Sequence, residues 1–187
     1  MVNPQTEYDP SRDFLWLDLE FTGLDDKRDV VIEVGAISTR GLFEVKGVFR
    51  AFIRHPEGLV ASLIDANPWW ANRPEHREVM LQSSDSAPSQ LKEVAAELSE
   101  FALDSAGEHP LSLAGNSVHF DRRWVMRDFP ELEDRLDHRM LDVSSLKLAA
   151  AELGIPEYKK KEEHRSISDI HESMAELKYL LDALKKA

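Results

Sequence analysis

The sequence has no cysteine, no long apolar run and no excess of basic residues, and each absence excludes a class of protein. Without cysteine, the 187-residue chain forms no disulfide, no thiolate zinc site and no thiol nucleophile. No stretch approaches the roughly 18 apolar residues of a membrane-spanning helix. The first ten residues are polar and acidic, which is unlike a secretory signal. These features together predict a cytoplasmic protein with no membrane partner.

The charge restricts the way in which the chain can meet nucleic acid. Lys and Arg number 23 against 35 Asp and Glu, which gives a formal net charge of −12. Proteins that coat long DNA or RNA neutralise phosphates with Lys and Arg and are usually basic overall. The chain is therefore a poor candidate for coating a duplex, but it can act on nucleic acid through a few local contacts or through metal ions.

The length and the 42% hydrophobic content suit one domain with a substantial core. We expect a flexible leader over residues 1–13 and a single domain over residues 14–187. Apolar, β-rich runs predict three early strands, and the short turns between them favour antiparallel pairing. These strands are expected over residues 14–20, 30–39 and 42–53.

Helices and short strands alternate in the rest of the chain, which predicts one α/β domain. The segment 55–86 is expected to hold short helical pieces near residues 59–64 and 75–81. Two further strands are expected over residues 111–114 and 139–142. Apolar spacing and helix-start signals predict longer helices over residues 91–101, 119–127, 143–153 and 167–184.

Asp18 and Glu20 form an acidic pair at the end of the first expected strand. Residues two apart on a strand project from the same face, and Phe14 and Trp16 precede the pair on that face. Two neighbouring anions that lose hydration repel each other, so either one takes up a proton or a cation lies between them. The alternative is that the strand emerges into solvent there and both are ordinary surface acids.

Asp121 and Asp169 each fall in the first turn of an expected helix, where the helix macrodipole alone favours an acid. Residues 166–169 also resemble a capping box, with Asp in place of the usual Glu or Gln. His164 lies in a polar loop five residues before Asp169, and a lone loop histidine is usually only solvated. It gains significance if Asp169 binds a metal, and clusters with oxygen ligands alone favour Mg²⁺ or Mn²⁺ over zinc.

The acidic pair, the mid-chain Asp and the final His and Asp occur in one order along the chain. With the residues around them, they resemble the DEDDh 3′-to-5′ exonucleases of the ribonuclease H-like fold, and most closely the oligoribonucleases. The matching segments are LWLDLEFTGL (15–24), GNSVHFDRR (115–123), RMLDVSSLK (139–147) and HRSISDIHES (164–173). The resemblance implies a mixed five-stranded sheet, with three antiparallel strands followed by two parallel ones, flanked by helices.

The resemblance also implies a metal-dependent hydrolysis that releases nucleoside 5′-monophosphates from the 3′ end of short single-stranded RNA. Two divalent cations, Mg²⁺ or Mn²⁺, would be held by Asp18, Glu20, Asp121 and Asp169. His164 would be the general base, since histidine, with a reference pKa of about 6.5, can take a proton from water near neutral pH. His119 is the rival base, ranked second because the family base precedes the last acid, and His171 is expected to face away.

Several positions match residues that bind substrate in the oligoribonucleases. Leu24 matches a leucine that wedges between two bases, and Arg139 and Ser144 match residues that cap the 5′ phosphate. For Arg139 the alternative is a surface ion pair with Asp134 or Asp137. The predicted substrate-binding residues are Thr22, Gly23, Leu24, Asn116, Ser117, Arg139, Ser144, Trp69 and Trp70.

Two departures from the family pattern leave alternatives open. The oligoribonucleases usually have a tyrosine before the matching arginine, contributed across a homodimer interface, and His138 stands here instead. The segment 55–86 does not follow the oligoribonuclease pattern either. Trp69 and Trp70 within it could stack on bases, worth about 1–3 kcal/mol per base, or could pack in the core.

The runner-up interpretation is a 3′ exonuclease that acts on single-stranded DNA or on a broader range of RNA and DNA ends. A fold kept only as a binding module is a third possibility. It is disfavoured because all four acids and the histidine are present.

Overall fold

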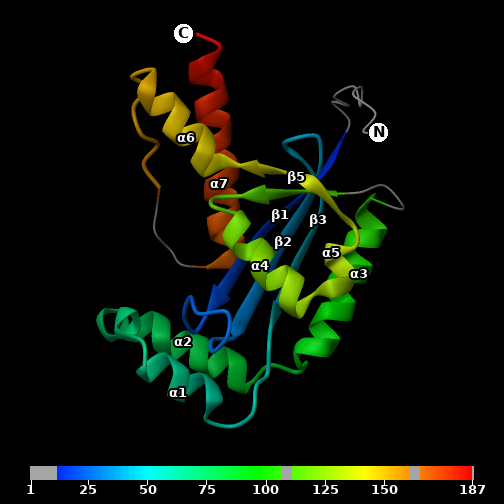
Figure 1. Ribbon diagram of the computed structural model, residues 1–187, viewed down its shortest axis with the longest axis vertical. Coiled ribbons are helices and arrows are strands. Elements are labelled where there is room, and N and C mark those ends of the chain that lie inside the picture. Colours follow the sequence, from blue (N-terminus) through cyan, green and yellow to red (C-terminus); the bar gives the residue numbers. More distant parts are fainter. Residues whose placement is uncertain (1–11, 107–110, 161–164, 187) are drawn as a thin grey trace.

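The computed structural model describes residues 12–106, 111–160 and 165–186, so most of the expected leader and His164 lie outside the described residues. Its centre is a five-stranded sheet in the order β3-β2-β1-β4-β5 (Figure 1). The first three strands pair antiparallel, and β4 and β5 run parallel to β1, which confirms the predicted mixed sheet. The strands are β1 (Asp13–Phe21), β2 (Val31–Arg40), β3 (Glu44–Phe52), β4 (Leu111–Gly115) and β5 (Leu136–Asp142).

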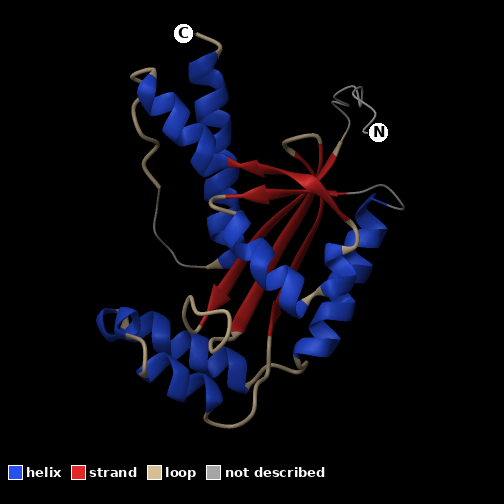
Figure 2. Ribbon diagram, in the orientation of Figure 1, coloured by secondary structure: helices blue, strands red, loops and turns tan. Residues whose placement is uncertain are grey.

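Helices cover both faces of the sheet and one of its ends (Figure 2). They are α1 (Leu59–Asp65), the 3₁₀ helix η1 (Pro68–Asn72), α2 (Pro74–Asp85), α3 (Leu91–Ala106), α4 (His119–Asp128), α5 (Pro130–Glu133), α6 (Val143–Glu152) and α7 (Ser166–Leu184). No helix in the described ranges is both long enough and apolar enough to cross a membrane.

Two strands begin two or more residues away from the expected start, for local reasons. β3 begins at Glu44 rather than at residue 42, because Gly41 has φ 55° and starts a three-residue turn. β5 begins at Leu136 rather than at Arg139, because Leu136 pairs with Leu111 and packs against the core. The hydrophobicity of the individual residues did not indicate that β5 pairs with β4 from Leu136 onward.

The side chains of β1 alternate between two cores, as the sequence predicts. Leu15, Leu17 and Leu19 are buried in a cluster with residues of α3 and α4 on one face. Phe14 and Trp16 are buried in a second cluster with residues of α7 on the other face. Because Asp18 and Glu20 continue the Phe14–Trp16 face, they lie on the side of the sheet that α7 covers.

A third, smaller core joins α1, η1 and α2 to β2. It consists of Ile32, Val60, Ile64, Trp70 and Met80. Figure 1 shows this helical unit at the end of the sheet toward which β1 runs. The segment that was hardest to interpret in the sequence therefore lies beside the carboxyl end of β1, where the acidic pair is.

Candidate active site

The structure brings together three of the four predicted acidic ligands. Asp18 and Glu20 near the end of β1 and Asp169 in the first turn of α7 each offer a carboxylate oxygen, and these oxygens lie within 4.8 Å of one another. Residues 18 and 169 are far apart in the sequence, so packing of α7 against the sheet creates the cluster. Oxygen-only carboxylate groups at this spacing suit a hard divalent cation such as Mg²⁺ or Mn²⁺.

Asp121 is held beside this cluster by the backbone of β1. It lies in the first turn of α4, is buried, and accepts a hydrogen bond from the Leu19 amide at 3.0 Å through Oδ1. Its charge contributes to raising the pKa of Asp18. Asp121 is not one of the three carboxylates that lie mutually within 4.8 Å, so the structure places it next to the cluster rather than within it.

Burial and mutual repulsion make the charged cluster costly without a cation. Burial, together with Asp121 and Glu20, raises the pKa of Asp18 well above its usual range. Burial and then Glu33 raise the pKa of Glu20 to about 8. Burial raises the pKa of Asp121 to about 7, in spite of the Leu19 hydrogen bond that lowers it. Bound cations would relieve this repulsion, so these residues fit a metal site.

The histidines are placed differently. His164, the predicted base, lies outside the described residues. The rival His119 is exposed, and its Nδ1 lies 3.3 Å from Asp142 Oδ2. His171 is exposed, in agreement with the expectation that it faces away.

The predicted capping box is only half formed. Asp169 Oδ2 accepts from the Arg165 amide at 3.2 Å, but Arg165, not Ser166, is the N-cap residue and no side chain caps the helix. Ser166 is instead the first residue of α7, fully buried, and its hydroxyl donates to Glu33 Oε1 at 2.5 Å. The prediction for Ser166 was wrong because contact with β2 takes its hydroxyl away from the helix end.

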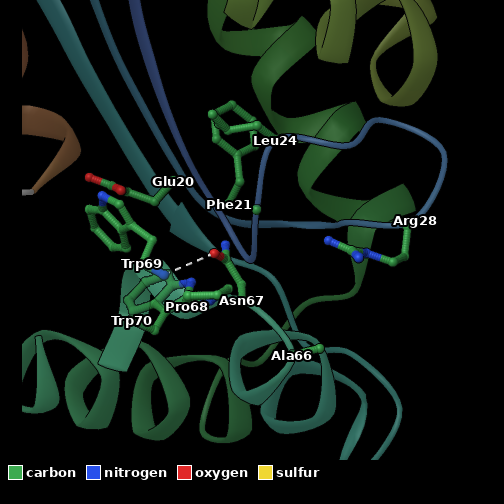
Figure 3. Close-up of a pocket in the computed structure, with 10 residues that line it drawn as sticks. Glu20, Phe21, Leu24, Arg28, Ala66, Asn67, Pro68, Trp69 and Trp70 are labelled. Atoms are coloured by element: carbon green, nitrogen blue, oxygen red, sulfur yellow. Dashed lines mark hydrogen bonds between the residues drawn. The ribbon is translucent and has the colours of Figure 1, made fainter. Parts of the chain in front are cut away.

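A pocket of about 520 Å³ adjoins the cluster, with Glu20 in its wall (Figure 3). Leu24, from the loop after β1, is 67% exposed, and Trp69 of η1 is 40% exposed. Both line the pocket from different segments, while Trp70 is 2% exposed and belongs to the third core. The pocket lining is Glu20, Phe21, Gly23, Leu24, Arg28, Ala66, Asn67, Pro68, Trp69 and Trp70.

One carbonyl connects the two walls of this pocket. The Thr22 carbonyl oxygen accepts hydrogen bonds from Asn67 Nδ2 and from Trp70 Nε1, both at 2.9 Å. Asn67 also accepts from the Trp69 amide at 3.1 Å, the dashed line in Figure 3. The segment that carries Trp69 is thereby fixed to the loop that carries Leu24.

The Leu24 loop is organised around Asp29, a buried residue that the sequence analysis did not single out. Asp29 accepts from the Thr22 hydroxyl at 3.1 Å and from the Asp25 amide at 3.0 Å, and it pairs with Arg28 at 3.1 Å. A Cβ atom at Gly23 would lie 2.5 Å from Asp29 Oδ2, so only glycine fits there. In the sequence, the run of turn-forming residues after Gly23 is the signal for this loop.

The predicted residues Asn116, Ser117 and Ser144 form a connected polar group. The Ser144 hydroxyl donates to Asn116 Oδ1 at 3.0 Å and lies 3.1 Å from the Ser117 hydroxyl. Asp142 Oδ1 accepts from the amides of Ser117 and Ser144 at 3.0 and 2.9 Å. This arrangement gathers hydroxyl and amide groups at the carboxyl ends of β4 and β5.

Arg139 contacts Asp137 on its own strand. Its amide donates to Asp137 Oδ1 at 2.8 Å, and its guanidinium lies 3.9 Å from the same oxygen. The ion pair with Asp137 that the sequence offered as an alternative is therefore present. His138 Nδ1 lies 3.0 Å from Asp137 Oδ1 as well.

Comparisons with known proteins agree with this geometry. The family model RNase_T, described as Exonuclease, matches residues 15–65 and 80–177. An oligoribonuclease of Pseudomonas aeruginosa is 33% identical over 97% of both chains, and one of Bordetella pertussis is 37% identical over 92% of this chain and 95% of its own.

Solved structures share the fold at low sequence identity. Exonuclease I from Methylocaldum szegediense has a TM-score of 0.62 at 14% identity and covers 94% of this chain. An Escherichia coli exonuclease I in complex with a dT13 oligonucleotide has a TM-score of 0.60 at 16% identity. The chain spans about two fifths of the length of these exonuclease I chains, 41% and 42% respectively. The ribonuclease H-like fold that the motifs predict is confirmed.

Proposed function

Because the chain belongs to the RNase_T exonuclease family, we propose that it is a metal-dependent 3′-to-5′ exonuclease that degrades short single-stranded RNA to nucleoside 5′-monophosphates. The observation that carries this proposal is the convergence of Asp18, Glu20 and Asp169 within 4.8 Å beside a pocket that can hold a base. Family membership confirms the resemblance that the motifs indicated.

In this proposal, Asp18, Glu20 and Asp169, together with Asp121, hold two divalent cations, Mg²⁺ or Mn²⁺. When bound, such a pair supplies a nucleophilic water and stabilises the departing 3′ oxygen. β1 and α7 hold Asp18, Glu20 and Asp169 in position, and bound cations would offset the cost of keeping these buried carboxylates charged. His164 is the general base in this proposal, five residues before Asp169 in the sequence.

The pocket supports recognition of the terminal bases. Trp69 offers a partly exposed aromatic face and Leu24 an exposed aliphatic side chain, both on the pocket wall that includes Glu20. Stacking on an aromatic side chain tolerates any base, since each base has a π face. We assign stacking to Trp69 and the base wedge to Leu24, with Thr22 and Gly23 shaping the loop and Trp70 supporting it from the core.

Several features favour short RNA over long strands. The relatives named oligoribonuclease match this chain over nearly its whole length. The net charge of −12 leaves little electrostatic attraction for an extended backbone. Asn116, Ser117 and Ser144 carry neutral donors that a phosphate would have to take from their present partners, and Arg139 is the cation that would have to leave Asp137 in order to cap it.

A 5′-labelled substrate series tests the proposal: a diribonucleotide, an RNA 5-mer, an RNA 20-mer and a DNA 20-mer, each with Mg²⁺ or Mn²⁺. We expect the diribonucleotide to be degraded fastest, and Asp18→Asn to abolish turnover without unfolding the chain. Preference for the DNA 20-mer would instead select the DNA-directed alternative. Substantial activity of Asp18→Asn would contradict the assignment of the metal ligands.

The homodimer that the family resemblance implies stays a prediction, as does the cytoplasmic location. Met140 on β5 and Leu148 and Leu153 around α6 are exposed apolar side chains that a second copy could cover. Light scattering of the purified chain across a concentration series measures its oligomeric state directly. A monomer at micromolar concentration would contradict the dimer.

A further inference from the structure

Glu33 on β2 is a fully buried carboxylate next to the acidic cluster, and neither the motifs nor the family signature singled it out. Its Oε1 accepts from Arg50 Nε of β3 at 2.7 Å and from the Ser166 hydroxyl of α7 at 2.5 Å. Glu33 therefore connects two strands of the sheet to the first residue of the helix that carries Asp169.

The strand register places this connection on the same face as the acids. Glu33 lies directly opposite Glu20, and Gly35 lies directly opposite Asp18. Directly opposed residues of an antiparallel pair project to the same face of the sheet. Glu33 thus belongs to the same layer as the proposed metal ligands and can influence where they lie.

Gly35 lets α7 rest directly on the sheet. A Cβ atom at Gly35 would lie 2.5 Å from Ser166 Oγ and 2.6 Å from Ser166 Cβ, distances that real side chains do not adopt. Ser166 therefore fills the space that a side chain of β2 would otherwise occupy. This contact fixes both the height of α7 above β2 and the rotation of its first turn.

The position of Ser166 determines the position of Asp169. The two residues are three apart on one helix, so their side chains lie on the same side, one turn apart. Asp169 accepts from the Arg165 amide, which restrains its carboxylate against the same first turn. A shift or rotation of this turn would move Asp169 away from Asp18 and Glu20 on the sheet.

We infer that Glu33 and Ser166 are positioning residues that hold the first turn of α7 so that Asp169 completes the metal site. The inference rests on the proposed function only in taking the three acids as cation ligands. Apart from this role, the charge of Glu33 disfavours ionisation of the acidic cluster, since it contributes to raising the pKa of Glu20. Its Oε2 also has no hydrogen-bond partner in the described structure. Positioning of α7 accounts for a buried acid at this point of the sheet.

The test is the affinity of the full chain for Mn²⁺, measured by titration calorimetry without substrate. Ser166→Ala removes one hydroxyl and no charge, so a loss of affinity cannot come from weaker electrostatic attraction. We expect affinity to fall about tenfold or more, the usual effect of removing a group that orients a metal ligand. We also expect kcat to fall with little change in KM, because the base pocket is unaltered.

Ser84→Ala is the matched control. Ser84 is also fully buried, and its hydroxyl donates to the Ile53 carbonyl at 2.8 Å, in the helical unit at the end of the sheet. It should cost similar stability and leave Mn²⁺ affinity unchanged. Equal affinity of Ser166→Ala and the wild type would overturn the inference, and so would equal losses in Ser166→Ala and Ser84→Ala.

Two further variants separate this inference from the proposed function. If Asp18→Asn binds Mn²⁺ as tightly as the wild type, the metal site itself is wrongly assigned. If Asp18→Asn loses Mn²⁺ and Ser166→Ala does not, only the role of Ser166 and Glu33 fails. Glu33→Gln is expected to weaken Mn²⁺ binding, and a wild-type affinity would contradict the role of Glu33.

Discussion

Replacing Glu20 by Gln should stabilise the protein when no divalent cation is present. The substitution keeps the shape of the side chain and removes one charge from a group of carboxylates within 4.8 Å. Burial and the neighbouring Glu33 raise the pKa of Glu20 from 4.5 to about 8. At neutral pH the folded state must therefore either hold a proton on this residue or tolerate an unfavourable charge.

The size and sign of the effect follow from linkage between protonation and folding. The pKa of Glu20 is higher in the folded state than in the unfolded state, so protonated Glu20 contributes to stability below about pH 4.5. This contribution is lost as the pH rises through about 8. For these two values, Glu20 costs about 3 kcal/mol at pH 7 and about 1 kcal/mol at pH 5. Glu20→Gln should therefore unfold with a free energy about 3 kcal/mol higher than the wild type at pH 7, and the difference should shrink to about 1 kcal/mol at pH 5.

Urea unfolding in EDTA at both pH values measures this difference, with Glu57→Gln as the control because Glu57 is exposed in the loop before α1. Saturating Mn²⁺ should reverse the order, since a cation that binds the folded state stabilises the wild type more than a variant that lacks one ligand. If Glu20→Gln is no more stable than the wild type in EDTA at pH 7, burial and the neighbouring carboxylates do not raise the pKa of Glu20.

Three more predictions test other parts of the site. Trp69→Ala should raise KM for a diribonucleotide about 5- to 150-fold, which corresponds to the loss of about 1–3 kcal/mol of stacking. Trp69→Phe should recover part of that loss, and equal KM values for Trp69→Ala and the wild type would contradict a stacking role. Asp29→Asn should lower the free energy of unfolding by about 1–3 kcal/mol, because a buried acceptor of several hydrogen bonds is replaced in part by a donor, and thermal melting measures it. Asp169→Asn should abolish turnover and remove the rise in melting temperature that Mn²⁺ produces in the wild type, while its circular dichroism spectrum stays unchanged; a retained Mn²⁺ response would argue against Asp169 as a ligand.

The strands and the face on which Asp18 and Glu20 lie could be predicted because these signals are local, whereas the family resemblance, not a local pattern, implied that Asp169 joins them. The alternation of Phe14, Trp16, Asp18 and Glu20 fixes the face on which the acids lie, and the structure has the two apolar faces of β1 packed as expected. The helices also follow their apolar spacing, with boundaries that differ by a few residues. A regular spacing of apolar residues indicates the type of element and its buried face from the segment alone, without knowledge of the rest of the chain.

The environment of Glu33 and Ser166 could not be predicted in the same way. Their hydrogen bond joins residues 133 positions apart and depends on how α7 packs on β2. In the sequence, Ser166 fits a helix cap and Glu33 interrupts an apolar strand without an evident partner. Trp69 and Trp70 raised a similar difficulty, because adjacent identical residues give no sign of which one turns inward until the core formed by α1, η1 and α2 is known.

The double hydrogen bond at the Thr22 carbonyl joins the loop after β1, the strand of the acidic pair, to the segment that carries Trp69. The acids lie on β1, α4 and α7, whereas Trp69 belongs to a helical segment that packs on β2 through the third core and hydrogen-bonds to the loop after β1 at the Thr22 carbonyl. A helical segment of different length or sequence on the same core would widen or narrow the pocket entrance without moving Asp18 or Asp169. Grafting residues 55–86 between related nucleases is therefore a direct route to altered substrate length.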